Sequence, residues 1–231
     1  MLKICAISDT HGQYNFDINP VNILFICGDI TPLYIQTNKQ QSFSWFIKKF
    51  IPWCKKQPVD QIYMVAGNHD FFLEVYPEPY VKELLIGTNI TILYNEGAEY
   101  LDENSGKIYT IWGSPNCKIF GNWAFMYSNE YNKEMYERMP NNLDFLITHD
   151  VPYGRNDILL QKDCKWANLE HIGNISLLEV VKERKPKYHF TGHLHSTDHE
   201  LKDYEGTKTA CVSLLDENYK MVYKPLYLDI E

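Results

Sequence analysis

The amino-acid sequence predicts an α/β fold, because short apolar runs alternate along the chain with segments of helical character. The runs are rich in β-branched residues and end abruptly in polar or glycine-rich turns; they span residues 2–7, 23–27, 61–66, 143–148 and 188–191. Continuous apolar runs of this kind are typical of strands covered on both faces. The helix-like segments span about residues 38–56, 74–86, 129–138 and 175–185. This order of elements favours stacked layers of helix and sheet.

The middle and the tail of the chain predict strands of another kind. Turns of the sequence Asn-Glu-Gly and Glu-Asn-Ser-Gly separate three short strand candidates, at residues 90–94, 98–101 and 107–112. Such turns are typical of antiparallel hairpins. Two further strands are expected at residues 209–215 and 221–228. No internal repeat or Pro/Gly/Ser-rich linker interrupts the pattern, so we expect one domain over residues 1–231.

Composition narrows the class of partner. The chain of 231 residues has 45% hydrophobic residues, which is enough for a sizeable core. Its formal net charge of -8 repels a nucleic-acid backbone, so we expect no tight nucleic-acid binding. A small phosphorylated substrate stays compatible with this charge, because bound metal ions invert the charge of a site locally.

Cysteine usage and hydropathy bear on location. Six cysteines occur without any C-x-x-C pair, several of them inside apolar runs, which predicts reduced and mostly buried thiols. The apolar N-terminal stretch is too short for a signal peptide, and no apolar run approaches the ~20 residues of a membrane span. We therefore expect a cytoplasmic protein with no membrane segment.

Each of the five apolar runs is followed at once by potential metal ligands. These are Asp9 and His11, then Asp29, then Asn68 and His69, then His149, and finally His193 and His195. Sites in open α/β sheets lie at the carboxyl ends of the strands. A single Asp or His at a strand exit is more often a cap or a satisfied polar residue. Five such exits in register are hard to explain in that way, so the pattern predicts one metal site.

The spacing of two pairs favours chelation. Asp9 and His11 are two residues apart, as are His193 and His195. Residues with this spacing project to one side of an extended segment. A mixed set of carboxylate, imidazole and amide oxygen suits Mn²⁺, Fe or Zn²⁺ better than Mg²⁺ or Ca²⁺, which prefer oxygen ligands alone.

The motifs SDTHG, CGDI, GNHD, THD and GHLH occur in this order over nearly the whole chain. The set resembles the five motifs of the calcineurin-like metallophosphoesterase superfamily. The resemblance implies a four-layer αββα sandwich of two mixed β-sheets, with two divalent metal ions (Mn, Fe or Zn) at the carboxyl ends of the strands. The implied ligands of the first ion are Asp9, His11, Asp29 and His195. Those of the second ion are Asn68, His149 and His193, with Asp29 as a shared bridge.

The resemblance also implies the reaction, which is hydrolysis of a phosphate ester by a hydroxide held between the two ions. The catalytic candidates are Asp29, as the bridge, and His69, which we expect to contact the phosphate or to protonate the leaving group. The alternative that His69 only orients a metal ligand stays open. The candidate substrate-binding residues are Asn68, His69 and Arg155.

Two features indicate which subfamily of this superfamily the chain resembles. The second motif continues with Ile30-Thr31-Pro32 and the third ends in Asp70, which differs from the serine/threonine protein phosphatases. The sequences WGSP at 112–115 and GNWAF at 121–125 are similar to the metallophosphoesterase domain-containing subfamily, which groups with cyclic-nucleotide-type phosphodiesterases. In that subfamily the fourth motif is usually Thr-His-Gly-Pro-Pro. Residues 150–152 differ from that motif, and the difference concerns the expected floor of the substrate pocket more than the metal site.

We therefore expect a phosphodiesterase that acts on small organic phosphodiesters, such as cyclic nucleotides. One alternative is a phosphomonoesterase or nucleotidase, because the same ions serve both reactions. Another is a non-catalytic protein-binding scaffold, against which the complete set of ligands argues. A candidate wall for the substrate pocket is the aromatic cluster of Trp112, Phe120, Trp123, Phe125 and Tyr127, for which core packing is an equally good interpretation.

Overall fold

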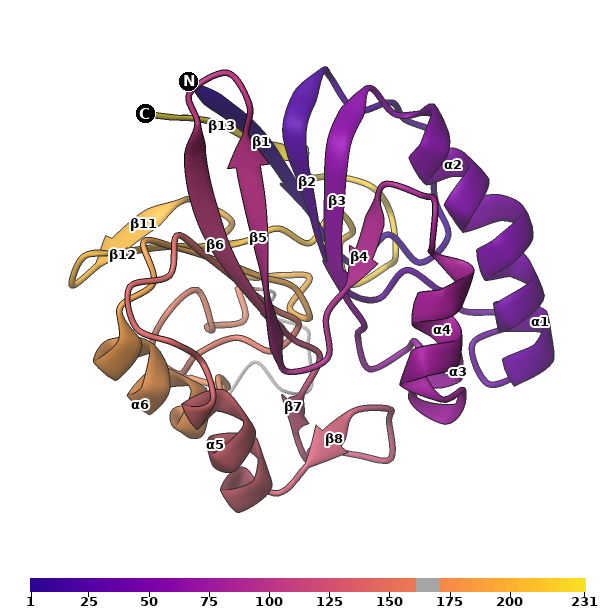
Figure 1. Ribbon diagram of the computed structural model, residues 1–231. Helices are drawn as coiled ribbons and strands as arrows, with labels where there is room; N and C mark the ends of the chain where they lie inside the picture. The colour runs from indigo at the N-terminus through magenta and orange to yellow at the C-terminus, as the bar shows by residue number, and fades with distance from the viewer. Residues whose placement is uncertain (161–170) are drawn as a thin grey trace.

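The computed structural model describes residues 1–160 and 171–231, which form two facing β-sheets with helices on their outer sides (Figure 1). The first sheet has the order β13-β1-β2-β3-β4, with strands β1 (Leu2–Ile7), β2 (Val21–Cys27), β3 (Val59–Val65), β4 (Ile90–Ile92) and β13 (Leu226–Ile230). The second has the order β11-β12-β10-β9-β6-β5, with strands β5 (Glu96–Asp102), β6 (Lys107–Ser114), β9 (Phe145–Thr148), β10 (Tyr188–Thr191), β11 (Lys202–Tyr204) and β12 (Thr207–Cys211). A short ribbon pairs β7 (Cys117–Lys118) with β8 (Met126–Tyr127).

Both sheets are mixed, as expected. Strands β1 to β4 run parallel to one another, and β13 pairs antiparallel with β1. In the second sheet β6, β9, β10 and β12 are parallel, while β5 and β11 are antiparallel strands at the two edges. The parallel strands of each sheet therefore end at a common edge, where the predicted ligands follow.

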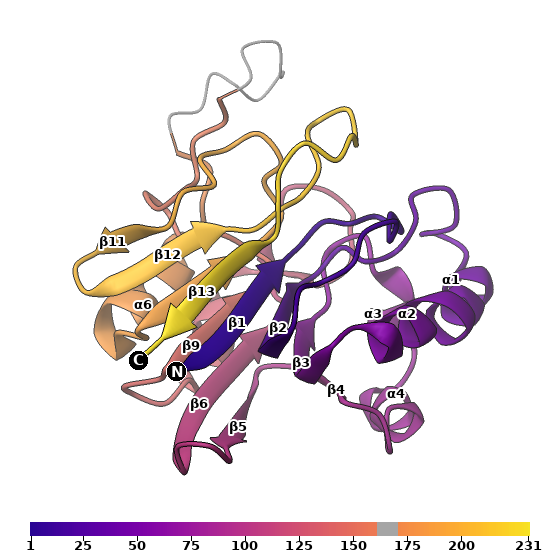
Figure 2. The same ribbon diagram turned by 90° about the horizontal axis from the view of Figure 1, so that it is seen from above.

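Helices cover the outer face of each sheet (Figures 1 and 2). Those beside the first sheet are α1 (Lys39–Trp45), the π-helical turn η1 (Phe46–Phe50), α2 (Ile51–Lys56), α3 (Phe71–Val75) and α4 (Glu78–Leu84). Those beside the second sheet are α5 (Asn129–Glu137) and α6 (Ile175–Arg184). Asn38 and Asn174 cap α1 and α6, since their side chains accept hydrogen bonds from the backbone N–H groups of Gln41 and Leu177.

The apolar strands serve two cores at once. In β1, Ile4 and Ala6 belong to the core between the sheets, whereas Cys5 and Ile7 belong to the core beneath the helices. In β9, Leu146 packs with residues of α5 and α6, while its neighbours in the strand face the other sheet. Alternate side chains of a strand point to opposite faces, so a strand covered on both faces needs apolar residues throughout. The four layers expected from the family resemblance are confirmed.

Three expectations about the elements were wrong in part. The helix expected at about 74–86 is two helices, because the chain is extended at Tyr76 and Pro77 between α3 and α4. The first strand of the expected antiparallel group, β4, instead pairs parallel with β3 in the first sheet. The chain then crosses to the second sheet, where β5 and β6 form the expected hairpin. The strand expected at 221–228 begins later, at Leu226.

Five cysteines (Cys5, Cys27, Cys54, Cys117 and Cys211) are buried free thiols, and Cys164 lies outside the described residues. Within residues 1–160 and 171–231, no helix is both long enough and apolar enough to cross a membrane.

His189 is a buried, neutral histidine inside β10. The Thr148 hydroxyl donates its hydrogen to the Asp150 carbonyl oxygen over 2.6 Å. The Thr148 Oγ1 atom therefore accepts from His189 Nε2, which lies 2.8 Å away. Burial, followed by the charge of Arg155, lowers the pKa of His189 from 6.5 to about 3. The imidazole is thus a fixed donor in the core and takes no part in the metal site.

This burial predicts a contribution to acid sensitivity in the metal-free protein. The pKa of His189 is lower in the folded state than in the unfolded chain, so the free energy of unfolding falls as the pH drops from 6.5 toward about 3. Between pH 7 and pH 5 the loss should be about 2 kcal/mol. His189→Gln keeps a donor for Thr148 but cannot titrate. Urea unfolding of both proteins at the two pH values measures the difference, and an identical pH dependence in both would contradict the assignment.

Candidate metal centre

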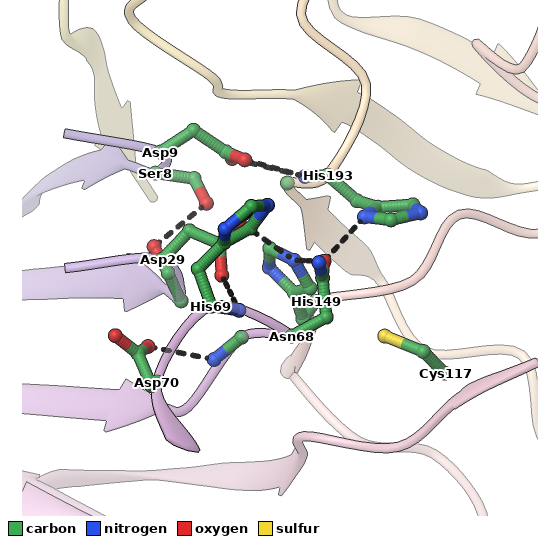
Figure 3. Close-up of polar contacts among 12 residues, drawn as sticks. Ser8, Asp9, Asp29, Asn68, His69, Asp70, Cys117, His149 and His193 are labelled. Carbon is green, nitrogen blue, oxygen red and sulfur yellow. Dashed lines mark hydrogen bonds and ion pairs between the residues drawn. The ribbon is translucent and has the colours of Figure 1, made fainter. Parts of the chain in front are cut away.

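The carboxyl ends of β1, β2, β3, β9 and β10 meet in one place and bring together all seven predicted metal ligands. Figure 3 shows Asp9, Asp29, Asn68, His149 and His193 directed toward a common centre. Six of the seven are buried, and His193 is half-buried. Charged and polar groups are rarely buried in such density unless they are paired or bind an ion.

The first group of ligands comes from β1 and β10. One ligand atom each of Asp9, His11 and His195 lie within 4.8 Å of one another. His195 Nε2 lies 3.3 Å from Asp9 Oδ1, and the Asp9 carboxylate accepts hydrogen bonds from the His193 N–H at 2.9 Å and from Ser213 Oγ at 2.8 Å. His195 Nδ1 donates to the Asp216 carbonyl oxygen over 3.0 Å, which leaves Nε2 as the ligand atom.

The second group comes from β3, β9 and β10. Asn68 Oδ1 lies 2.9 Å from His149 Nε2 and 2.8 Å from His193 Nδ1 (Figure 3). His149 Nδ1 donates to the Cys27 carbonyl oxygen at 2.7 Å, so its Nε2 faces the centre. These three residues are the ligands that the family resemblance assigns to the second ion.

Asp29 lies between the two groups. Its Oδ2 atom is 3.7 Å from His11 Nε2 in the first group and 3.5 Å from His149 Nε2 in the second. Its Oδ1 atom accepts a 2.7 Å hydrogen bond from the His69 N–H, which fixes the orientation of the carboxylate. The position suits a ligand shared by two cations.

His11 shows that the residues fit a metal ion. Both of its ring nitrogens are buried and have no hydrogen-bond partner among the described residues. Burial lowers the pKa of His11 to about 4, so the ring is neutral and has a free lone pair. A neutral imidazole beside the carboxylates of Asp9 and Asp29 is a donor set for Mn²⁺, Fe or Zn²⁺.

The carboxylates of the centre are ionised. Burial opposes ionisation of Asp9, but the hydrogen bond from His195 and the charge of His149 outweigh it and hold the pKa of Asp9 below its usual value. Burial likewise opposes ionisation of Asp29, whose pKa is held well below its usual value by the charges of His149 and His69. In turn, against the effect of burial, Asp29 raises the pKa of His149 to about 10 and Asp9 raises that of His195 to about 9. Metal ions bind neutral imidazole, so metal binding would release these protons.

The backbone at the centre is strained. Asp9, His11, Asp29 and His193 have positive φ angles of 53°, 42°, 52° and 71°, in the left-handed region. Such conformations cost of order 1–3 kcal/mol each in residues other than glycine and persist where the surroundings impose them. Here the Asp9 N–H donates to the Gly28 carbonyl oxygen and the His11 N–H to that of Asp29, each at 3.0 Å. The left-handed backbone conformation directs the ligand side chains toward the centre, and it lowers local stability.

Two glycines allow the close approach. A Cβ atom at Gly67 would lie 2.2 Å from Asp29 Oδ1. A Cβ atom at Gly192 would lie 2.6 Å from Asp9 Oδ2 and 2.1 Å from Ser8 Oγ. Real Cβ atoms do not come so close to another heavy atom. Both positions therefore require glycine if the carboxylates are to stay where they are.

His69 stands at the edge of the centre. Its Nδ1 atom contacts Gln36 Oε1, and its Nε2 atom lies 3.8 Å from Asp29 Oδ2. The ring packs against Trp123, with 4.5 Å between ring centroids, and lines the adjoining cavity. One ligand atom each of His69, His11 and Asp29 also lie within 4.8 Å of one another. This geometry suits a contact with a phosphate held beside the ions.

Asp70 joins two motifs and does not face the cavity. Its carboxylate accepts hydrogen bonds from the Gly67 N–H, the Ile30 N–H and both the N–H and the hydroxyl of Thr31. Burial and the charge of Asp29 raise the pKa of Asp70 to about 6, against these donors. It thereby holds the turn after β2 against the turn after β3, and so supports the ligands on both turns.

Arg155 does not reach the cavity. Its buried guanidinium lies 3.6 Å from Glu205 Oε2 and packs over the ring of Tyr204 at 5.4 Å. The residues that line the cavity do not include it. Arg155 therefore lies away from the cavity in which a phosphate contact was predicted, because the turn after His149 directs it toward the β11–β12 hairpin.

A cavity of about 360 Å³ opens beside the centre and is lined by Asp29, Asn68, His69, His193 and His195 together with apolar residues. Of the predicted aromatic wall, Phe120 and Trp123 line it. The other three pack into or against the apolar cores. Two residues near the centre were not predicted: Gln36, which contacts His69, and Tyr219, which lies in the cavity wall.

Comparison with known proteins agrees with this geometry. Residues 2–197 match the model of the calcineurin-like phosphoesterase family. Metallophosphoesterase domain-containing protein 1 of Homo sapiens is 26% identical over 246 residues, which cover 99% of this chain and 71% of that protein, and the Mus musculus protein of that name gives the same values. The structure of phosphopantetheinyl hydrolase from Mycobacterium tuberculosis has the same fold, with a TM-score of 0.55 at 13% identity over 94% of this chain and 90% of that chain. The chain belongs to the calcineurin-like phosphoesterase family.

Proposed function

We propose that the protein is a phosphodiesterase that hydrolyses small organic phosphodiesters with the help of two divalent metal ions. The observation that carries the proposal is the position of Asp29, whose carboxylate lies within 3.7 Å of ligand nitrogens from both groups. The first ion would be held by Asp9, His11, Asp29 and His195. The second would be held by Asn68, His149 and His193 together with Asp29.

The ions, when bound, would supply Lewis acidity that activates water at neutral pH and offsets charge on the phosphoryl oxygens. The protein's own residues orient the reaction. Asn68, Asp29 and His69 all line the cavity, so a phosphate held by the two ions would lie beside the His69 ring. An imidazole so placed can donate a proton from Nε2 to the departing oxygen of the ester.

The lining of the cavity favours a diester over a monoester. Among its described residues the one lysine or arginine is Lys118, whose ammonium group donates to the backbone carbonyl oxygens of Ile172 and Gly173. A phosphomonoester carries a second negative charge that this group is not free to meet. The singly charged diester, with a second organic group to place in the cavity, suits the lining better.

The closest alternative is a phosphomonoesterase or nucleotidase, since the same ligands serve that reaction. A non-catalytic scaffold is disfavoured by the buried and ionised carboxylates and by the strained backbone, which cost stability without serving a protein-binding surface. Manganese, iron and zinc all suit the donor set.

The experiment that tests the proposal compares two substrates. Protein stripped of metal and reloaded with Mn²⁺ should hydrolyse bis-p-nitrophenyl phosphate with a higher kcat/KM than p-nitrophenyl phosphate, and chelator should abolish both activities. A higher kcat/KM for the monoester would instead identify the protein as a phosphomonoesterase. Fe²⁺, Zn²⁺ and Co²⁺ serve as parallel reloading arms.

The role of His69 has a test based on the leaving group. We expect His69→Ala to lower kcat by about 10²- to 10⁴-fold for a diester with an alkyl leaving group, which needs a proton as it departs. The loss should be much smaller for p-nitrophenolate, which departs as a stable anion. Equal losses for the two leaving groups would instead assign His69 to positioning a ligand or the phosphate.

A further inference from the structure

The cavity beside the metal centre continues between aromatic side chains that stand next to the imidazoles of both ligand groups. Trp123 packs against His69, with 4.5 Å between ring centroids, and Phe120 lies 5.1 Å from the ring of His193. Tyr219 lies edge-on to the ring of His11 at 5.1 Å, and at 5.3 Å from the ring of His195. An organic group attached to a phosphate at the centre would therefore contact an aromatic ring whether it extends toward Trp123 and Phe120 or toward Tyr219.

These aromatic residues keep substantial exposed surface beside the centre. Trp123 is 36% exposed, Phe120 is 45% exposed and Tyr219 is 38% exposed. Buried apolar side chains of Leu159 and Leu194 add to the lining. Exposed aromatic surface in a concave site beside polar groups is typical of a ligand pocket.

Tyr219 is held in place at a conformational cost. Its φ angle of 57° lies in the left-handed region, which is rare for an aromatic residue. Its carbonyl oxygen accepts from Gln13 Nε2 at 2.8 Å, and its N–H donates to the carbonyl oxygen of Asp216 at 2.8 Å. That same carbonyl oxygen accepts from His195 Nδ1. The turn that presents Tyr219 is thus tied directly to a metal ligand.

The charged residues of the cavity lining also favour an uncharged organic group. Lys118 is engaged by backbone carbonyl oxygens, and no other described lining residue is a lysine or an arginine. Glu217, on the same turn as Tyr219, adds a carboxylate to the wall. A second anionic group on the substrate would meet this carboxylate and, within the described part of the wall, no free cation.

We propose that this cavity binds an organic group of the ester and selects groups that are flat, apolar and uncharged, with Trp123 and Tyr219 as the contacts that recognise them. The substrates are then phosphoesters of aromatic or similarly flat alcohols without a second anionic group. Glu217 discriminates against substrates that carry one. This proposal rests on the proposed function of the metal centre for the placement of the phosphate.

Three phosphonates that differ only in the organic group test the cavity: methylphosphonate, phenylphosphonate and 4-carboxyphenylphosphonate. Calorimetric titration into the Mn²⁺-loaded protein gives their affinities without turnover. Phenylphosphonate should bind about 10-fold more tightly than methylphosphonate, because the ring leaves water for an apolar wall. The added carboxylate should weaken binding by about 3- to 10-fold through repulsion by a partly exposed charge.

Substitutions test which residues cause these differences in affinity. Trp123→Ala and Tyr219→Ala should each bring the phenyl-to-methyl ratio toward one, and Trp123→Phe should retain most of it. Glu217→Gln should reduce the penalty for the carboxylate. The matched control is Glu103→Gln, which removes the same charge from an exposed position on the turn between β5 and β6 and should change neither ratio.

Equal affinities for phenylphosphonate and methylphosphonate, or a ratio that survives both alanine variants, would overturn the proposal. A carboxylate penalty that is unchanged in Glu217→Gln would remove Glu217 from it. If the protein shows the expected affinity ratios but hydrolyses no ester with any metal, the proposed role of the cavity stands and the proposed function is refuted. Metal-dependent hydrolysis with equal affinities would refute the cavity alone.

Discussion

Asp29→Asn is expected to lower metal-dependent phosphoester hydrolysis by about 10³-fold or more, which corresponds to roughly 4 kcal/mol of lost transition-state stabilisation. The Asp29 carboxylate lies 3.7 Å from a ligand nitrogen of the first group and 3.5 Å from one of the second. An amide lacks the negative charge that two cations require, and its NH₂ group has no lone pair to offer an ion. Both ion sites should therefore weaken together.

The control for this change is Asp17→Asn, which alters an exposed aspartate remote from the ligand set and should leave kcat within experimental error. Thermal unfolding of both variants in chelator separates loss of function from loss of fold. If Asp29→Asn retained even a tenth of the activity, the carboxylate would not be the shared ligand.

Gly67→Ala is expected to disable the centre without changing any ligand. The new Cβ atom would lie 2.2 Å from Asp29 Oδ1, 2.4 Å from the Asp29 backbone nitrogen and 2.7 Å from His149 Cε1. These neighbours are the carboxylate and backbone of Asp29 and the buried ring of His149, so relief requires moving Asp29 itself. A displacement of a ligand by about 1 Å typically costs on the order of 10²-fold in rate. We expect a loss of that size in kcat/KM, together with a weaker affinity for Mn²⁺.

Gly97→Ala is the matched control. The Cβ atom that it adds in β5 would lie no nearer than 3.4 Å to another heavy atom, and neither Gly67 nor Gly97 has a left-handed φ angle. The comparison therefore isolates the steric contact with Asp29. Wild-type affinity for Mn²⁺ and wild-type turnover in Gly67→Ala would show that the carboxylate can occupy another position.

The residues of the metal centre were predictable because each follows a strand with a strong apolar signal. The runs at 2–7 and 188–191 coincide with β1 and β10, so the residues after them fall at the sheet edge. Strand partners were harder to predict. The segment of β4 has the composition of a hairpin strand, and no local feature states that it pairs with β3 in the other sheet.

The parts of the site that depend on loops escaped prediction. Gln36 meets His69 across 33 residues of sequence, and Tyr219 reaches the centre through a turn far along the chain from His11. Neither contact leaves a periodic pattern. Arg155 shows the opposite error, since nearness to His149 in sequence suggested a role in the pocket that its contacts with Glu205 and Tyr204 do not support.

We expect the converging strand ends to hold two divalent ions and to use them to hydrolyse phosphoesters. The most direct measurement is a titration of the stripped protein with Mn²⁺ in which bound metal and turnover of bis-p-nitrophenyl phosphate are recorded on the same samples. We expect binding of two equivalents, with full turnover only when both are bound. Tight binding of no more than one equivalent, or two bound equivalents without turnover of any phosphoester by Mn²⁺, Fe²⁺, Zn²⁺ or Co²⁺, would contradict it.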